Sequence, residues 1–282
     1  MNQHDRYRIS VWGTGNVALR LSVALKDAGH SLEYICGRDV ESGNKIVRIL
    51  NRSGNKPDCS FTTDYTCLKE SEVVVIAVSD DAIKELSEKF ATLFDTRQDQ
   101  YTGMAEPPLV VHTSGASPAT VLASNSRYGV LYPLMTLSKI KPVDFRLVPF
   151  LLEGSDSVAE KILSSIVFSL GSEYHFCNSA ERLRTHVAAV YISNFINYLA
   201  GLAFEISKPN QTLLLPLAIE TVRKAFLYEN PFDVQTGPAR RGDIETICKH
   251  LEILGKYPEH RHLYIEITNL ILERSGFEKI KI

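Results

Sequence analysis

The sequence predicts an α/β protein in which a doubly wound, mostly parallel sheet is followed by an all-α domain. Two observations predict it. From Arg8 to about Gly154, apolar runs of strand length alternate with segments of helical spacing, the pattern of a parallel sheet covered by helices. From Ala180 onward, long apolar stripes at helical spacing continue without a strong breaker. We place the domain boundary there, giving domains of residues 1–178 and 179–282.

The first strand leads into a turn suited to phosphate groups. It runs into Gly13-Thr14-Gly15-Asn16-Val17-Ala18, a G-x-G-x-x-A turn, and then into a helical segment. The first glycine permits the tight turn, the second lets the backbone approach a pyrophosphate, and the helix N-terminus attracts negative charge. This is the pattern of a Rossmann dinucleotide site, so we expect Gly13, Thr14, Gly15, Asn16 and Val17 to bind a coenzyme.

The second strand, over residues 31–36, ends beside the residues that select the dinucleotide. A site for NAD places Asp or Glu at this strand tip, where the carboxylate bonds the ribose 2′-OH. Here the tip is Gly37-Arg38-Asp39. A guanidinium at Arg38 can bind a 2′-phosphate through two hydrogen bonds and stack on adenine, which favours NADP(H). Asp39 is the alternative, since a slip of one residue puts a carboxylate at the ribose.

The other strands of the sheet domain follow in order. Residues 72–78 form an apolar run, as expected for a strand covered on both faces, and Ser79-Asp80-Asp81 then begins a helix. Further strands are expected over 109–111, 129–132, 147–152 and 173–176, with a polar loop over 95–108 and a helix over 158–170. Pro149 puts its strand at or near a sheet edge.

The second half is expected to contain only helices. Their spacing predicts helices over about 180–206, 213–227, 244–254 and 262–274. Pro216 should kink the second of these or mark its first turn.

Composition and charge narrow the class of protein. Of the 282 residues, 44% are hydrophobic and 23% charged, so a proper core can form. The net charge of −2 argues against a nucleic-acid binder that relies on phosphate neutralisation. The five cysteines are scattered without a C-x-x-C pair, which suits a reducing cytoplasm and offers no metal site. With no signal-peptide region and no uninterrupted apolar run near the length of a membrane span, we expect a soluble cytoplasmic protein that acts on a small molecule.

Four linked motifs carry a resemblance to a known family. They are His112–Ala116, Tyr132–Thr136, His186–Asn194 and Thr236–Asp243. On these motifs the chain resembles Rossmann-like oxidoreductases whose N-terminal half is similar to deazaflavin-dependent NADP oxidoreductases and whose C-terminal half is a helical domain of unknown function. The wider superfamily includes 6-phosphogluconate dehydrogenase, pyrroline-5-carboxylate reductase, prephenate dehydrogenase and ketopantoate reductase. The resemblance implies NADP-dependent hydride transfer to or from a small, anionic metabolite.

Candidate site residues follow the carboxyl ends of the strands, where ligands of doubly wound sheets lie. The segment Val78-Ser79-Asp80 is expected along the cofactor ribose, and His112-Thr113-Ser114-Gly115 at the nicotinamide end. Hydride transfer also needs a proton donor or acceptor for the reacting oxygen or nitrogen. His112 has a suitable intrinsic pKa for this role. The alternative is a strand-end imidazole bonded to backbone.

The resemblance adds roles for two further positions. Ser114 is expected to orient substrate by hydrogen bonding, as the Ser-Gly pair of 6-phosphogluconate dehydrogenase does. Tyr132 stands where prephenate dehydrogenase has a His before its Pro-Met pair. A phenol is a weaker base unless a cation lowers its pKa, so we assign Tyr132 to substrate binding.

The long helix that opens the helical domain carries His186 and Asn194. In the sugar-acid dehydrogenases this helix supplies a catalytic Lys, with an Asn four residues later. If Asn194 matches that Asn, Val190 occupies the Lys position, and His186 is left as the candidate general acid one turn earlier. The alternative is that Ser193, Asn194 and Asn197 bridge two helices through buried hydrogen bonds.

Arg240 and Arg241 lie on a loop before a helix that Asp243 is expected to cap. Two guanidinium groups can bind a carboxylate or phosphate of the substrate; arginines that are solvated or paired across an interface are the alternative. In relatives of pyrroline-5-carboxylate reductase the helical domains pair between subunits, so the resemblance implies a homodimer.

Two function classes therefore stand at the level of sequence. The first is an NADP-dependent oxidoreductase, supported by the phosphate-binding turn, Arg38 and the strand-end motifs. The second is a non-catalytic nucleotide-binding or sensing protein that keeps the Rossmann fold, supported by the missing Lys. Turnover of NADPH separates the two.

Overall fold

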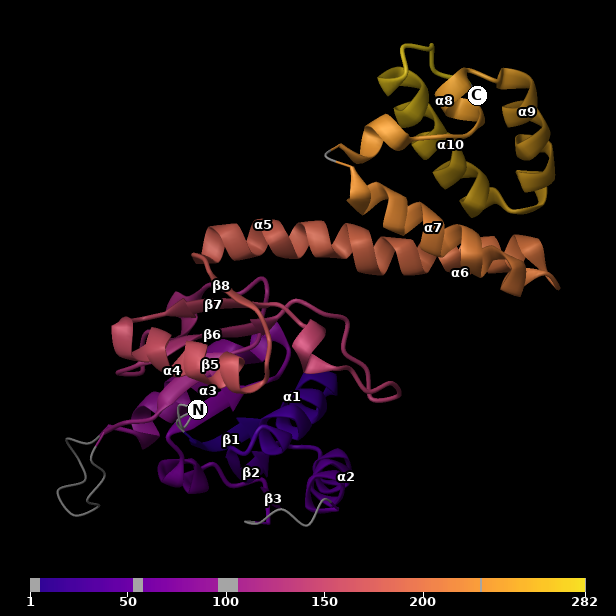
Figure 1. Ribbon diagram of the computed structural model, residues 1–282. Helices are drawn as coiled ribbons and strands as arrows, with labels where there is room; N and C mark the ends of the chain where they lie inside the picture. Colours follow the sequence, from indigo (N-terminus) through magenta and orange to yellow (C-terminus); the bar gives the residue numbers. More distant parts are fainter. Residues whose placement is uncertain (1–5, 53–57, 96–105, 229, 282) are drawn as a thin grey trace. The chain divides into compact units, whose positions relative to one another are not determined.

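The computed structural model describes residues 6–52, 58–95, 106–228 and 230–281. Eight strands form one sheet in the order β3-β2-β1-β4-β5-β6-β7-β8 (Figure 1). The strands are β1 Arg8–Trp12, β2 Ser31–Cys36, β3 Ser60–Thr62, β4 Val73–Ile76, β5 Leu109–His112, β6 Tyr128–Pro133, β7 Phe150–Gly154 and β8 Tyr174–Phe176. Among these strands, neighbours are parallel except for β6 and β7. The doubly wound, mostly parallel sheet predicted from the sequence is confirmed.

Helices cover both faces of the sheet because its central strands are apolar throughout. Successive residues of a strand point to opposite faces. Val73 and Val75 belong to one apolar cluster, and Val74 and Ile76 to a second. The first cluster contains residues of α1 Asn16–Asp27, α2 Val40–Asn51 and α4 Ser157–Ser169, and the second contains residues of α3 Asp80–Leu93. This packing fixes the strand ends from which the site is built.

Two parts of the sheet domain differ from the sequence prediction. The strand expected over 147–152 begins only at Phe150, because Asp144 caps a short 3₁₀ helix, Phe145–Leu147. Pro149 directly precedes β7, which lies next to the edge strand β8. The stretch after Gly37 also holds α2 and β3, which the apolar pattern did not single out. Most of the polar loop expected over 95–108 lies outside the described residues.

The remainder of the chain is helical, as predicted. Its helices are α5 Ser179–Val190, α6 Ile196–Ser207, α7 Leu214–Leu227, α8 Pro238–Arg241, α9 Ile244–Ile253 and α10 Pro258–Arg274. Pro216 lies in the first turn of α7, where it is tolerated. A π-helical turn, Tyr191–Phe195, joins α5 to α6. Helix α10 begins one turn earlier than expected, since Pro258 is its first residue.

One helix bears on the expectation that no uninterrupted apolar run approaches a membrane span. The continuous helix Ser179–Ser207 is long and apolar enough to cross a membrane by length and composition alone. A single helix of this kind is weak evidence for a membrane segment.

The chain divides into two compact units, Met1–Ser193 and Asn194–Ile282. The boundary expected at 178/179 coincides with the start of α5, and it stays a prediction. The second unit has a small core. Its apolar cluster of buried residues contains Ala239, Ile247 and Leu272, and neither α6 nor α7 contains a buried residue.

Candidate functional site

The first unit has a cleft of about 560 Å³ at the carboxyl ends of its parallel strands. Eleven of the residues predicted for the site line this cleft. They are Gly13, Thr14, Gly15, Asn16, Val17, Arg38, Val78, Ser79, Ser114, Tyr132 and His186. The structure therefore brings together segments from five strand ends and from α5. Asp80 and Thr113, which follow the same strand ends, line the cleft as well. Trp12 also lines it, although the sequence reasoning gave it no role.

The turn Gly13–Val17, called the phosphate turn below, has the geometry that a diphosphate needs. Gly13 has φ +144°, and a Cβ there would lie 2.1 Å from the carbonyl oxygen of Ala77, so only glycine fits. Gly15, the residue before α1, has no side chain that could cap the helix. No heavy atom lies within 4 Å of the position that a Cβ on Gly15 would take. The first N–H groups of α1 consequently face open space that suits an anion.

Arg38 and Asp39, the two residues after β2 that the sequence offers as coenzyme ligands, have different surroundings. The Asp39 carboxylate accepts a hydrogen bond of 3.0 Å from the backbone N–H of Ser42 and caps α2. This bond holds the pKa of Asp39 below its usual range. Arg38 is exposed and lines the cleft. Both residues line the cleft, but the carboxylate of Asp39 is already engaged at the N-terminus of α2.

Tyr132 and His186 form a pair at another part of the cleft. The Tyr132 hydroxyl lies 2.9 Å from His186 Nδ1, and the two rings meet edge to face. Both side chains are half-buried. Burial raises the pKa of the Tyr132 phenol, so this hydroxyl stays protonated near neutral pH and can donate a proton. Gly115 makes room for the pair, because a Cβ there would lie 2.6 Å from His186 Nδ1.

His112 is fully buried and bonded to backbone at both ring nitrogens. Its Nε2–H donates to the carbonyl oxygen of Pro118 over 3.3 Å, and its Nδ1 accepts from the backbone N–H of Ser114 over 3.1 Å. Burial and the charge of Arg182 lower the pKa of His112 to about 4. A neutral imidazole therefore shapes the loop that presents Ser114. The alternative weighed from the sequence, a strand-end imidazole bonded to backbone, matches this geometry.

Ser114 holds its own loop. Its Oγ accepts hydrogen bonds from the backbone N–H groups of Ala116 and Ser117, at 3.1 and 2.9 Å. The hydroxyl hydrogen is not used in either bond. Ser114 can therefore donate one hydrogen bond into the cleft.

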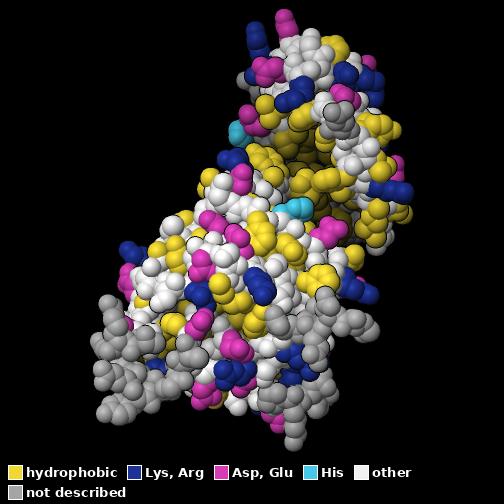
Figure 2. Space-filling view, turned by 60° about the vertical axis from the view of Figure 1, so that its left-hand side comes forward, with side chains coloured by type: hydrophobic (Ala, Val, Ile, Leu, Met, Phe, Trp, Pro, Cys, Tyr) yellow, Lys and Arg dark blue, Asp and Glu magenta, His cyan; other side chains and the backbone are white. Residues whose placement is uncertain are grey.

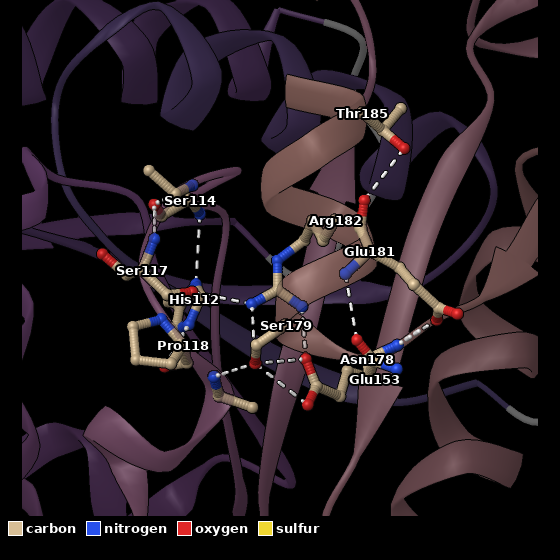
Figure 3. A network of polar contacts seen from close by, with 12 residues as sticks. His112, Ser114, Ser117, Pro118, Glu153, Asn178, Ser179, Glu181, Arg182 and Thr185 are labelled. Atoms are coloured by element: carbon tan, nitrogen blue, oxygen red, sulfur yellow. Dashed lines mark hydrogen bonds and ion pairs between the residues drawn. The ribbon is translucent and has the colours of Figure 1, made fainter. Parts of the chain in front are cut away.

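A buried ion pair attaches α5 to the sheet (Figure 3). Arg182 has no exposed surface, and its guanidinium pairs with the Glu153 carboxylate of β7. The same guanidinium donates to the carbonyl oxygen of Ser117 over 2.7 Å, and the Ser179 hydroxyl donates to Glu153 over 2.8 Å. These bonds fix the first turn of α5, one turn before His186.

The sequence reasoning missed Arg182 and Glu153. A signal was present, since a carboxylate at the end of an apolar strand needs a partner if it is buried. The partner lies 29 residues away in the sequence, at a spacing that no local pattern specifies.

The other predicted residues lie in the second unit. Asn194 is the first residue of this unit, within the π-helical turn Tyr191–Phe195, and does not line the cleft. A π turn has more residues than an α turn, so the four-residue spacing from His186 does not continue through it. Arg240 and Arg241 are exposed on α8. Asp243 caps α9 through a 3.0 Å bond from the N–H of Thr246, as predicted. The roles of Asn194, Arg240 and Arg241 stay predictions.

Comparison with known proteins gives matches along most of the chain. The Rossmann-like domain matches residues 2–137, and the domain of unknown function DUF2520 matches residues 148–271. The chain is similar to a candidate NADP oxidoreductase, BF3122 from Bacteroides fragilis, with 31% identity, a TM-score of 0.82, and coverage of 96% of this chain and 100% of that one. No curated protein matches the sequence.

Two more distant structures share the fold. The pyrroline-5-carboxylate reductase of Coxiella burnetii has 18% identity and a TM-score of 0.53, with coverage of 96% and 98%. The Plasmodium falciparum pyrroline carboxylate reductase, solved with NADP bound, has 13% identity and a TM-score of 0.55, with coverage of 97% and 98%. At these identities the likeness concerns the fold alone.

Proposed function

The chain belongs to the family of Rossmann-like proteins that carry a DUF2520 domain, and from this premise we propose that it is an NADP-dependent oxidoreductase of a small, anionic metabolite. One observation supports this most strongly. A single cleft of the first unit contains an open phosphate turn and a hydrogen-bonded Tyr132–His186 pair. A dehydrogenase or reductase needs a coenzyme site and a proton donor within reach of one another.

The residues present fit NADP(H). The open N-terminus of α1 receives the diphosphate, and Arg38 receives the 2′-phosphate, because Asp39 is engaged in capping α2. Val78 and Ser79, which also line the cleft, would lie along the cofactor ribose. When bound, the nicotinamide supplies or accepts the hydride; the rest of the reaction falls to residues of this chain.

Proton transfer is the role we assign to the Tyr132–His186 pair. In the reductive direction the Tyr132 hydroxyl gives its proton to the oxygen or nitrogen of the substrate. His186 then passes its Nδ1 proton to the phenolate and takes up a proton from water at Nε2, so that the imidazole stays neutral. The raised pKa of Tyr132 suits this direction, since the phenol is protonated before the reaction. Ser114 donates a hydrogen bond that orients the substrate, and His112 acts as a positioning residue behind it.

Arg240 and Arg241 stay our candidates for binding a carboxylate or phosphate of the substrate. Arg240 and Arg241 are adjacent, exposed cations at the end of α8, and guanidinium groups bind carboxylate or phosphate with two hydrogen bonds each. Asn194 stays a candidate catalytic residue; it lies in a π-helical turn, a geometry that recurs at functional sites.

We also propose that the protein works as a homodimer through its helical unit. Helix α7 exposes more than half of each of Leu215, Leu217, Ile219, Phe226 and Leu227. Hydrophobic side chains gather on this unit around a hollow (Figure 2), and a cavity of about 330 Å³ there is lined mostly by apolar residues. Each such side chain gains about 1.5–3 kcal/mol when covered. A second copy of the same unit is the partner that offers a matching apolar surface.

The dimer is tested by light scattering. Wild-type protein is expected at twice the chain mass, and Leu217→Glu is expected to shift it toward the monomer. Leu147→Glu, at an equally exposed leucine of the first unit, should leave the dimer intact. A monomeric wild-type protein at micromolar concentration would refute this part of the proposal.

The activity is tested in two steps. NADPH is first titrated calorimetrically, and its consumption is then screened over keto acids, imines and flavins. With any acceptor found, Tyr132→Phe should lower kcat about 100-fold, as loss of a general acid does, while the NADPH Kd changes less than twofold. If NADPH binds tightly and no acceptor is reduced, the sensing alternative replaces the enzyme. If NADPH does not bind, both are wrong.

A further inference from the structure

Cys36 and Cys67 bring two free thiols together at the edge of the coenzyme cleft. Their sulfur atoms lie 3.8 Å apart. A disulfide requires about 2.05 Å, so a movement of about 2 Å would join them. Cys36 is the last residue of β2 and is fully buried, whereas Cys67 is half-buried on the 3₁₀ helix Thr66–Glu70. A small oxidant can therefore reach the pair from the side of Cys67.

The two thiols are not equivalent. The hydrogen bond with Cys36 lowers the pKa of the Cys67 thiol, because it stabilises the thiolate; burial and the carboxylates of Asp64 and Glu70 oppose this. The same bond, together with burial, raises the pKa of Cys36. Cys67 is consequently the sulfur suited to react first, and Cys36 keeps its proton until it resolves the product.

Cys36 is directly connected to the phosphate turn. Its carbonyl oxygen accepts a 2.8 Å hydrogen bond from the N–H of Gly13, and Arg38 lies two residues later. The packing between them is close, since a Cβ at Gly37 would come within 3.1 Å of the Thr14 side chain. A displacement of Cys36 would therefore move the groups that bind the diphosphate and the 2′-phosphate.

The Cys67 side also adjoins the cleft. Leu68, its neighbour, is fully buried and anchors the 3₁₀ helix in the core. Tyr65 packs edge-on against Trp12 with ring centroids 6.4 Å apart, and Trp12 lines the cleft. If the 3₁₀ helix made the whole movement that a disulfide requires, Tyr65 would move with it and displace Trp12, which lines the cleft.

We propose that Cys36 and Cys67 are a reversible modification site, at which hydrogen peroxide forms a disulfide that weakens NADPH binding. This inference rests on the proposed function. The Cys67 thiolate attacks one peroxide oxygen, the O–O bond breaks, and the hydroxide released takes up the thiol's proton as water. The Cys36 sulfur then attacks the Cys67 sulfenic acid, the S–O bond breaks, and a second water leaves with the Cys36 proton. Two thiols and one peroxide give one disulfide and two waters, and a dithiol reverses the step.

The experiment compares reduced, peroxide-treated and dithiol-restored full-length protein. Peptide mapping should find a Cys36–Cys67 link after treatment with a small excess of peroxide. Calorimetry should find the NADPH Kd raised at least about tenfold in the linked form and restored by dithiothreitol. Cys67→Ser should bind NADPH like the reduced wild type and lose the response. Cys248→Ser, at an exposed cysteine of the second unit, should keep it.

Three results would overturn the proposal: no Cys36–Cys67 link, a link that leaves the NADPH Kd unchanged, or a peroxide response that persists in Cys67→Ser. Failure of the proposed function is distinguishable from these, because the reduced wild type would then fail to bind NADPH whether or not the link forms. That outcome would remove the regulatory effect along with the activity.

Discussion

Arg38 offers the most direct test of the coenzyme proposal, because the residue beside it provides a matched control. Arg38 is exposed at the cleft, whereas the carboxylate of Asp39 accepts a 3.0 Å bond from Ser42 and caps α2. We predict that Arg38→Ala weakens NADPH binding about 100-fold and changes NADH binding less than twofold.

The magnitude follows from the geometry. A guanidinium on a phosphate makes two charge-assisted hydrogen bonds, each of which contributes about 1.5–3 kcal/mol. Because Arg38 is solvent-exposed, the lower figure applies to each bond. Their sum of about 3 kcal/mol corresponds to a factor of about 100 in Kd.

The assay is calorimetric titration of wild type, Arg38→Ala and Asp39→Ala with NADPH and with NADH, at one fixed ionic strength. Asp39→Ala should lower the free energy of unfolding by about 1 kcal/mol, through loss of the α2 cap, and leave the NADPH Kd within about twofold. Equal weakening of both coenzymes by Arg38→Ala, or selective loss of NADH binding in Asp39→Ala, would refute the assignment of the 2′-phosphate to Arg38.

Two further predictions concern stability. Burial lowers the pKa of His30 and of His112 from 6.5 to about 4, so below about pH 6.5 the unfolded chain binds protons that the native state does not. The free energy of unfolding should fall by about 2 kcal/mol per histidine between pH 7 and pH 4.5. Urea titrations of His30→Gln and His112→Gln should each show a smaller fall over this pH range. A fall as large as that of wild type in both variants would contradict the prediction. Glu153→Gln should lower the free energy of unfolding by about 3–5 kcal/mol, because it leaves the buried Arg182 charge without its counter-ion. Arg182→Met added to Glu153→Gln should restore much of this loss. If Glu153→Gln alone is as stable as wild type, the ion pair does not stabilise the fold.

The parts of the fold that were predictable are those encoded locally. The apolar run of β4 and the glycine turn before α1 each specify their structure within a few residues, because a doubly covered strand and a tight turn need particular residue types. Helix α2 was not predicted, because its capping residue was considered for another role. Asp39 was weighed as a ribose ligand, and its spacing to Ser42 is equally that of a helix cap.

The site was predictable up to the point where distant segments meet. The phosphate turn, Val78 and Ser79 follow strand ends in the sequence, and the cleft contains them. The Tyr132–His186 bond joins residues 54 positions apart, so the sequence offered both as separate candidates but could not pair them. The π-helical turn was also beyond reach, since it changes the phase of a helix that the apolar stripe alone describes as regular.

Gly115 tests the Tyr132–His186 pair without removing either side chain. A Cβ at this position would lie 2.6 Å from His186 Nδ1 and 2.7 Å from Tyr132 Cζ, where ordinary contacts are 3.4–4 Å. In Gly115→Ala the rings must separate by about 1 Å, which breaks their 2.9 Å hydrogen bond. We expect kcat to fall about 100-fold and the free energy of unfolding to fall by about 1–3 kcal/mol through overpacking.

The double variant decides whether the loss comes from the pair. Tyr132→Phe already lacks the hydrogen bond, so Gly115→Ala added to it should lower kcat by less than about threefold, because the two changes remove one interaction. Gly255→Ala is the control, since no heavy atom lies within 4 Å of its added Cβ, and it should leave kcat and the NADPH Kd unchanged. If the effects of Gly115→Ala and Tyr132→Phe on kcat simply multiply, Gly115→Ala does not act through the Tyr132–His186 hydrogen bond, and the assignment of proton transfer to the two rings as a pair is wrong.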